Sequence, residues 1–218
     1  MLHEKGLLIS AEGCDGSGKS SALERACARL NQEGYTFLLT REPGGNKISE
    51  KIRNIILDID NKDEDIKTEA LLYAASRRQL MAQQLFPLLD DNQIVITDRF
   101  VDSSLAYQGY GRDLGADEIL KINMFAIDGR FPNWTLFFDL DPEEGLRRIS
   151  SKRGEKMDRL DNEKLSFHQK VYDGYKELEK KYSSRYISID ASKSMDEVYL
   201  QTYKILKEKI DDFLAKVK

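Results

Sequence analysis

The stretch Gly13-Cys-Asp-Gly-Ser-Gly-Lys-Ser20 decides the fold, because it matches the pattern G-x-x-x-x-G-K-[ST] at every fixed position. It follows a short apolar run at residues 6–12 and precedes residues 19–33, whose apolar side chains recur with helical spacing. A loop between a strand and a helix directs its backbone N–H groups, and the positive end of the helix dipole, at phosphate oxygens. We therefore expect residues 13–20, the phosphate cradle, to bind a nucleoside triphosphate.

Each residue type in the cradle suits this task. Glycines let the backbone approach the phosphates, Lys19 supplies a positive charge to the β- and γ-phosphates, and the Ser20 hydroxyl is placed for Mg²⁺. The predicted donor-binding set is Gly13, Cys14, Asp15, Gly16, Ser17, Gly18, Lys19 and Ser20. The cradle identifies the donor but does not separate ATPases, GTPases and kinases, which share it.

Apolar runs alternate with helical patterns along the whole chain. This order predicts a parallel sheet with helices on both faces and right-handed crossovers. We expect strands at residues 6–12, 35–40, 94–98, 135–140 and 186–190. We expect helices at residues 19–33, 49–57 with Ser49 as N-cap, 67–89 with a bend near Pro87, 105–110, 116–127, 143–149, a charged stretch ending near Tyr182, and 195–217. The fold class is α/β, with a five-stranded parallel sheet in a single domain spanning residues 1–218.

Composition restricts the partners. Of 218 residues, 40% are hydrophobic and 33% charged, and the net charge of −4 argues against a polynucleotide partner. The two cysteines, Cys14 and Cys27, are too few for a disulfide framework or a zinc site and suit a reducing compartment. There is no N-terminal signal pattern and no apolar stretch of membrane-spanning length. We expect a cytoplasmic protein with no membrane partner.

The dipeptide Asp98-Arg99 stands at the carboxyl end of the third predicted strand, where ligands of open α/β sheets lie. Asp98 could hold Mg²⁺ together with Ser20, and Arg99 could clamp a phosphate in bidentate fashion. The dipeptide alone is equally compatible with a surface ion pair at a strand end.

A basic run between residues 147 and 159 interrupts the alternating pattern. Such a run is usually a solvated charged loop. Its position also suits a small mobile lid at about residues 148–160, which would exclude water and bring an arginine to the transferred phosphoryl group.

Four segments together give the chain a resemblance to a known family. They are Glu-Gly-Cys-Asp-Gly-Ser-Gly-Lys-Ser (12–20), Thr-Arg-Glu-Pro-Gly-Gly (40–45), Thr-Glu-Ala-Leu-Leu-Tyr-Ala-Ala-Ser-Arg-Arg (68–78) and Thr-Asp-Arg-Phe-Val-Asp-Ser-Ser-Leu-Ala-Tyr-Gln-Gly (97–109). Along nearly its whole length the chain resembles thymidylate kinase in its bacterial form. The resemblance implies a P-loop NTPase fold, phosphorylation of dTMP by ATP with Mg²⁺, and a homodimer.

The resemblance also implies roles for the acceptor-binding residues. Asp15 would hydrogen-bond the sugar 3′-hydroxyl, and Arg41 and Arg99 would hold the acceptor phosphate. The peptide bond before Pro43 would be cis. Tyr73, where related sequences often carry Phe, would stack on the thymine ring.

The remaining implied roles concern the base edges and the sugar. Arg77 would donate to a thymine carbonyl, and Ser104 and Gln108 would reach the other base edge. Tyr107 would crowd the sugar 2′ position and disfavour a ribonucleotide. Without the resemblance, Tyr73 and Tyr107 are more simply explained as core residues.

The family has a variant in which the cradle lacks an arginine and the lid supplies the charge, and Gly16 beside Asp15 resembles that variant. Of the lid arginines Arg148, Arg153 and Arg159, the resemblance favours Arg153 as the catalytic one, with Arg159 second. The predicted catalytic set is Lys19, Arg99, Arg153 and Asp15.

Two other functions remain open from the sequence. One is a monophosphate kinase for adenylate or cytidylate, which would share the cradle and the lid but not the Tyr-Gln stretch. The other is a regulator that binds a nucleotide without transferring phosphate.

Overall fold

The computed structural model describes residues 5–153, 159–160 and 163–217, and for residues 152 and 153 it describes the backbone only. The strands are β1 (Leu7–Glu12), β2 (Leu38–Arg41), β3 (Ile94–Asp98), β4 (Trp134–Asp139) and β5 (Tyr186–Asp190). The helices are α1 (Lys19–Gln32), α2 (Lys47–Leu57), α3 (Ile66–Leu80), α4 (Phe86–Asp90), α5 (Val101–Ser104), α6 (Ala116–Ile127), α7 (Pro142–Arg153), α8 (Leu165–Lys181) and α9 (Met195–Val217). Two π-helical segments, η1 (Met81–Leu85) and η2 (Leu105–Gly111), join α3 to α4 and continue α5.

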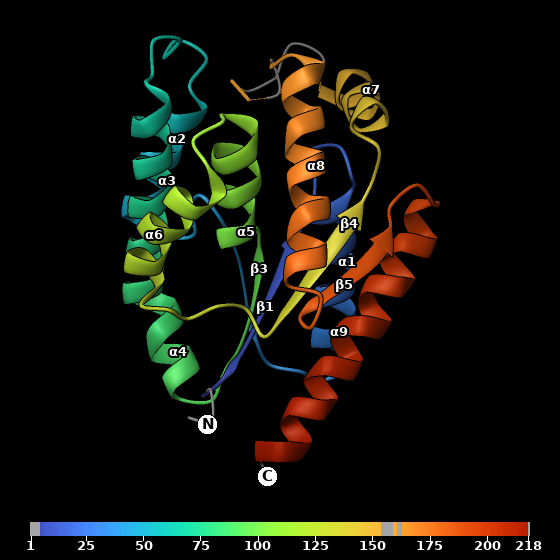
Figure 1. Cartoon of the computed structure of the whole chain (residues 1–218). Coiled ribbons are helices and arrows are strands. Elements are labelled where there is room, and N and C mark those ends of the chain that lie inside the picture. Colours follow the sequence, from blue (N-terminus) through green and yellow to red (C-terminus); the bar gives the residue numbers. More distant parts are fainter. Residues whose placement is uncertain (1–4, 154–158, 161–162, 218) are drawn as a thin grey trace.

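The strands form one sheet in the order β2-β3-β1-β4-β5, with every neighbouring pair parallel. The predicted α/β class and the five-stranded parallel sheet are therefore confirmed (Figure 1). The cradle leaves the carboxyl end of β1, and Asp98 ends the adjacent strand β3, where it is in register with Ala11. This order brings the two predicted ligand-binding segments side by side.

Successive side chains of β1 point to opposite faces of the sheet, so β1 contributes to the core on both faces. Leu7, Ile9 and Ala11 pack with α1 and α9 on one face. Leu8 packs with the α3–α4 region on the other, and Glu12 at the strand end is also fully buried. Each face is covered, as expected for a parallel sheet (Figure 1).

The second strand begins later than predicted. The prediction placed it at residues 35–40, whereas β2 begins at Leu38. The reason lies at the end of α1, where the Tyr35 N–H donates to the Leu30 carbonyl at 3.1 Å. That bond closes the helix and uses a donor that strand pairing would have needed.

The N-cap of α2 was also predicted wrongly. The prediction was Ser49, but the helix begins at Lys47 and Asn46 caps it, its side-chain oxygen accepting from the N–H groups of Ile48 and Ser49 at 3.1 and 3.0 Å. Ser49 lies inside the helix and is buried, and its hydroxyl donates to the Ser76 carbonyl of α3 at 2.8 Å. Asn and Ser both cap well, so local sequence did not decide between them.

The helix predicted at residues 67–89 runs without a break, but it changes from α-helix to π-helix at Met81 and returns to α-helix at Phe86. The π-helical segment η1 widens the turn, and the Phe86 N–H donates to the carbonyl of Met81, five residues earlier. Proline lacks an N–H and its ring crowds the carbonyl four residues before it. A wider turn at this position accommodates both constraints.

The helix predicted at 143–149 extends as α7 from Pro142 to Arg153, so the first residues of the predicted lid are helical. Asp141 caps this helix by accepting from the N–H groups of Glu143 and Glu144. Residues 154–158 of the predicted lid lie outside the described part of the chain. The lid therefore stays a prediction.

Candidate active site

The cradle packs closely against α7. Gly16 has a φ of 77°, and a Cβ atom there would collide with the carbonyl oxygen of Gly145. Gly145 in turn has no room for a side chain against the Asp15 carbonyl. The glycine at position 16 thus allows α7 to lie directly on the cradle, where a larger residue such as arginine would hold it off.

This close packing places an arginine of α7 beside the phosphate cradle. Arg148 lines the hollow formed by residues 14–21 of the cradle and the start of α1. Its Nε donates to Glu144 at 2.7 Å and its Nη1 to the Ala191 carbonyl at 3.1 Å, which fixes the guanidinium between the cradle and the end of β5. A second hollow, lined by Arg148, Ala191, Met195 and Val198, continues from the first.

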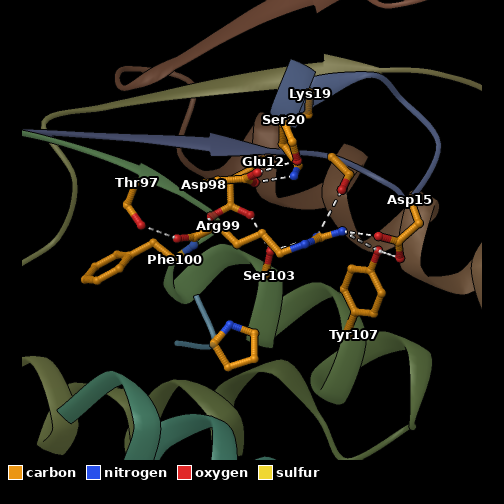
Figure 2. A network of polar contacts seen from close by, with 12 residues as sticks. Glu12, Asp15, Lys19, Ser20, Thr97, Asp98, Arg99, Phe100, Ser103 and Tyr107 are labelled. Carbon is orange, nitrogen blue, oxygen red and sulfur yellow. Dashed lines mark hydrogen bonds and ion pairs between the residues drawn. The ribbon is translucent and has the colours of Figure 1, made fainter. Parts of the chain in front are cut away.

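Lys19, Ser20 and Asp98 form a compact polar cluster between the first turn of α1 and the end of β3 (Figure 2). Lys19 forms an ion pair with Asp98, and the Ser20 hydroxyl donates to the same carboxylate at 2.5 Å. Burial raises the pKa of Asp98, but the charges of Lys19 and Arg99 more than offset this and lower it. The carboxylate is therefore ionised at neutral pH.

The donor set of this cluster fits Mg²⁺. A hydroxyl and an ionised carboxylate are hard oxygen ligands, and Mg²⁺ usually takes one or two protein ligands and fills its remaining positions with water and phosphate oxygens. Within the described residues there is no group of three or more His, Cys, Asp or Glu side chains that could hold a metal alone. A site completed by substrate phosphates suits these residues better than a closed protein site.

Arg99, Asp15 and Tyr107 meet in one hydrogen-bonded cluster (Figure 2). The Arg99 Nη2 donates to Asp15 at 2.5 Å and to the Tyr107 hydroxyl at 3.1 Å, and Tyr107 donates to the other Asp15 oxygen at 2.6 Å. Burial raises the pKa of Asp15, but the charge of Arg99 and the bond from Tyr107 lower it overall to about 2. Asp15 is thus a negatively charged hydrogen-bond acceptor held beside the positive charge of Arg99.

The backbone of Arg99 is unusual, with a φ of 71° in the left-handed region that non-glycine residues rarely adopt. Three hydrogen bonds hold it there. The Arg99 N–H donates to the Ala11 carbonyl at 2.9 Å. The Thr97 hydroxyl donates to the Arg99 carbonyl at 2.8 Å, and the Phe100 N–H donates to Glu12 at 2.7 Å (Figure 2). This conformation turns the side chain of Arg99 across the end of β1 toward Asp15.

Glu12, at the end of β1, also organises the side chain of Arg99. Its second carboxylate oxygen accepts from Ser103 at 2.6 Å and from Tyr175 of α8 at 3.2 Å. Both of these hydroxyls also accept from the Arg99 Nη1, at 3.0 and 3.2 Å. Burial, followed by the negative charge of Asp102, raises the pKa of Glu12 to about 7.

A pocket opens beside these clusters at the carboxyl ends of β1, β2 and β3. Its lining contains most of the predicted acceptor-binding residues, namely Asp15, Arg41, Pro43, Tyr73, Arg99, Ser104, Tyr107 and Gln108, together with Lys19, Ser20 and Asp98. We call it the acceptor pocket. It therefore borders the phosphate cradle, with Asp15, Lys19 and Ser20 lining both hollows.

Arg77 is the predicted acceptor residue that does not line this pocket. Its side chain is only 1% exposed and lies behind the pocket wall. It pairs with Glu42 at 2.6 Å, and donates to Ser104 at 3.0 Å, to Asn123, and to the Phe100 carbonyl at 2.9 Å. Bonds to described residues account for four of its five N–H groups, and its direct contact with a base stays a prediction.

The loop after β2 forms one side of the acceptor pocket. The Glu42–Pro43 peptide bond is cis, as expected. Arg41 pairs through Nη2 with both oxygens of Glu50, at 2.9 and 3.0 Å, and Glu50 also accepts from the Gly45 N–H at 2.9 Å. Arg53 of α2 donates to the Pro43 carbonyl at 2.9 Å. Helix α2 therefore sets the position of this loop.

The arginines of the predicted lid separate into different environments. Arg148 borders the cradle, as described above. The side chain of Arg153, the favoured catalytic residue, lies outside the described part of the chain. Arg159, the second choice, pairs with Glu64 at 2.5 Å and Glu69 at 2.7 Å on the acceptor side.

Several residues around the site have no role among the sequence-based predictions. Glu12, Ser103 and Glu69 lie inside the segments quoted for the resemblance but were given no role. Arg53 and Leu57, four residues apart on the predicted second helix, line the pocket from one helix face, and that spacing was a usable signal. Tyr175 gave no local signal, because only tertiary packing brings α8 to Arg99.

In the described part of the chain, no helix is long and apolar enough to cross a membrane. Both cysteines are buried free thiols.

Comparison with known proteins agrees with this geometry. The family model for thymidylate kinase matches residues 11–201. The chain is 50% identical to a thymidylate kinase of Geobacillus sp. (strain WCH70), over 95% of this chain and 99% of the relative, and 47% identical to one of Clostridium novyi, over 93% and 99%. A crystal structure of thymidylate kinase from Ehrlichia chaffeensis superposes with a TM-score of 0.74 at 30% identity, covering 93% of this chain and 99% of the other. The chain belongs to the thymidylate kinase family.

Proposed function

We propose that this protein transfers the γ-phosphoryl group of ATP to dTMP. An oxygen of the acceptor phosphate bonds to the γ-phosphorus, while the bond from that phosphorus to the β–γ bridging oxygen breaks. The products are dTDP and ADP. A phosphate oxygen is already a competent nucleophile, so the reaction needs no strong base and no covalent enzyme intermediate.

One observation carries the proposal: the phosphate cradle and the acceptor pocket share a border at Asp15, Lys19 and Ser20. Two phosphates that are to react repel each other, and catalysis requires positive charge and fixed orientation between them. Lys19 on the donor side and Arg99 on the acceptor side supply such charge at that border. Arg41 lines the same pocket and could reach the acceptor phosphate from the loop after β2.

The donor nucleotide is proposed to lie with its phosphates in the cradle and its base toward the hollow beside Arg148, Ala191 and Met195. Ser20 and Asp98 would hold Mg²⁺. When bound, Mg²⁺ would neutralise charge on the phosphate oxygens. Arg153 is proposed to add the positive charge that the cradle lacks.

The acceptor nucleotide is proposed to lie with its sugar 3′-hydroxyl at Asp15 and its base against Tyr73. Ionised Asp15 is a hydrogen-bond acceptor for a hydroxyl at any pH well above about 2. Tyr107 is locked to both Asp15 and Arg99, so its ring is a rigid wall at the sugar. A rigid wall there would disfavour the 2′-hydroxyl of a ribonucleotide.

A direct test is dTDP formation from ATP, Mg²⁺ and dTMP, followed by chromatography of the nucleotides. We expect stoichiometric dTDP and ADP, and little ADP when dTMP is omitted. ATP binding without dTDP formation would contradict the proposal and support a regulator that only binds nucleotide.

We also propose that the protein is a homodimer whose interface uses α2, α3 and α6. These helices lie side by side (Figure 1) and expose large apolar side chains, among them Phe125 at 84% and Leu71 at 56% exposure. Helix α3 carries Tyr73 within the acceptor pocket and Leu71 on its outer surface, so a second copy would brace the pocket wall. Light scattering should give a dimer for the wild type and a monomer for Phe125→Glu, and a monomeric wild type would refute this interface.

The cellular location is proposed to be the cytoplasm. Cys14 and Cys27 are free thiols, as expected in a reducing compartment.

A further inference from the structure

Behind the wall of the acceptor pocket lies Glu69, a carboxylate of α3 that does not line the pocket itself. It is 0% exposed. Its Oε1 accepts from the Gln108 Nε2 at 2.9 Å and, in a longer bond, from the Arg112 Nε at 3.3 Å. Its Oε2 accepts from Arg112 at 3.0 Å and from Arg159 at 2.7 Å. A buried carboxylate with this many donors is a fixed structural feature of the pocket wall.

Glu69 is ionised. Burial raises its pKa, but the hydrogen bonds and charge of Arg112, with the bonds from Gln108 and Arg159, lower it overall. An ionised carboxylate has no proton to donate. Every group that hydrogen-bonds to the Glu69 carboxylate must therefore be the donor in that bond.

This requirement fixes the orientation of the Gln108 amide. The amide has a donor end, Nε2, and an acceptor end, Oε1, and these are interchangeable in shape. Glu69 accepts the Nε2 end and would repel the Oε1 end. Since Gln108 lines the acceptor pocket, its oxygen is left to accept a hydrogen bond from the ligand.

Ser104 presents a hydrogen-bond donor to the pocket, the opposite of Gln108, and again a buried neighbour is the cause. Ser104, four residues earlier, also lines the pocket, and its oxygen accepts from the Arg77 Nη1 at 3.0 Å. Because a guanidinium only donates, the hydroxyl proton of Ser104 remains available to the ligand. The pocket wall thus presents a donor at Ser104 and an acceptor at Gln108.

We propose that Glu69 is a specificity-determining positioning residue, which makes Gln108 an acceptor and thereby selects a base with an N–H next to a carbonyl on its pairing edge. Thymine and uracil present this edge through N3–H and O4. Cytosine presents the reverse, a bare N3 next to an amino group, and would face acceptor with acceptor. The inference rests on the proposed function, since it assumes a pyrimidine nucleotide in this pocket.

The variant Glu69→Gln tests the idea with little change in shape. The Oε2 position accepts from two guanidinium groups at 3.0 and 2.7 Å, whereas the Oε1 position has one longer guanidinium contact at 3.3 Å. The oxygen of the new amide should therefore take the Oε2 position, and its NH₂ should face Gln108. Gln108 would then turn its oxygen to residue 69 and its NH₂ to the pocket. We expect the ratio of dTMP to dCMP affinity, measured by titration calorimetry, to fall at least about tenfold, the effect of mispairing one buried hydrogen bond. The same ratio of kcat/KM should fall with it.

Two further variants separate a reversal of the Gln108 amide from a general weakening of the hydrogen bonds around Glu69. Arg112→Lys weakens the same cluster but keeps Glu69 ionised and facing Gln108, so it should leave the ratio within about twofold of the wild type. In the Gln108→Met background, Glu69→Gln should no longer change the ratio, because the two residues act as one unit.

The inference is overturned if Glu69→Gln weakens both nucleotides equally, if Arg112→Lys lowers the ratio as much, or if the effect persists without Gln108. It is also overturned if the wild type binds dCMP as tightly as dTMP. Calorimetry keeps this result separate from the proposed function, which fails instead if the wild type binds dTMP but forms no dTDP.

Discussion

The phosphate cradle and the acceptor pocket share a border, yet they are built in opposite ways. The cradle is one contiguous stretch, residues 13–20, whose binding groups are mostly backbone N–H groups and whose conformation depends on glycines. The acceptor pocket is built from side chains that come from the loop after β1 and from α1, β2, α2, α3, β3, α5 and η2. A backbone site binds any nucleoside triphosphate, whereas a side-chain site can be fitted to one acceptor. We therefore expect mutations in one site to impair donor binding or acceptor choice without impairing the other.

The largest effect is expected for Lys19→Ala in the cradle. In the proposed mechanism its charge stabilises phosphates that belong to the donor, so kcat should fall about 10²- to 10³-fold for every acceptor alike. Steady-state rates with dTMP and dUMP measure this, with circular dichroism as a check that the fold is intact. A rate near that of the wild type would remove Lys19 from the mechanism.

Arg153→Ala should lower kcat about 10²-fold while leaving dTMP affinity unchanged, because the proposed mechanism needs its charge mainly in the transition state. Arg159→Ala is the matched comparison. Arg159 pairs with Glu69 behind the acceptor pocket, so its loss should raise the KM for dTMP more than it lowers kcat. If the two variants exchange these behaviours, Arg159 is the catalytic arginine.

Tyr107→Phe should produce a smaller effect that is confined to the acceptor side. The ring stays, but Asp15 and Arg99 lose a hydrogen-bond partner, so the KM for dTMP should rise about 3- to 10-fold. The KM for ATP should not change. An equal change in both KM values would show that the two sites do not fail separately.

The smallest effect concerns the pH dependence of stability. The pKa of Glu12 is raised by burial to about 7, so the folded protein retains a proton that the unfolded chain loses above its ordinary pKa of 4.5. Between pH 4.5 and 7 the native state binds more protons than the unfolded state, and stability falls as pH rises. Glu12→Gln lacks this group, so its free energy of unfolding relative to the wild type should increase across that range. A constant difference between the two proteins would contradict the raised pKa.

The same contrast explains what could be predicted from the sequence. The cradle, the strand before it and the helix after it follow from local pattern, because the motif and its context are contiguous. The sheet class followed from alternating apolar runs. Asp98 and Arg99 were found because they end a strand, but their pairing with Lys19 and Asp15 required the strand order. The acceptor residues came from a family resemblance rather than from local pattern.

The misses also have physical causes. Ser49 and Asn46 are both good caps, and only the packing of Ser49 against α3 decides between them. The late start of β2 depends on how α1 ends. Glu69 lies behind the pocket wall, so no local pattern reveals which neighbour it orients.

The most direct measurement is a competition among acceptors. Wild-type protein is given Mg²⁺ and ATP labelled at its γ-phosphate, with equal, subsaturating concentrations of dTMP, dCMP, CMP and AMP, and the labelled diphosphates are separated by chromatography at low conversion. Only a diphosphate made from an acceptor carries the label, because the ADP left by the donor loses its γ-phosphate. If the acceptor pocket is fitted to thymidylate, labelled dTDP should exceed every other labelled diphosphate by at least about tenfold. Formation of ADP from AMP, or of CDP, at a rate equal to or above that of dTDP would contradict the assignment of the acceptor.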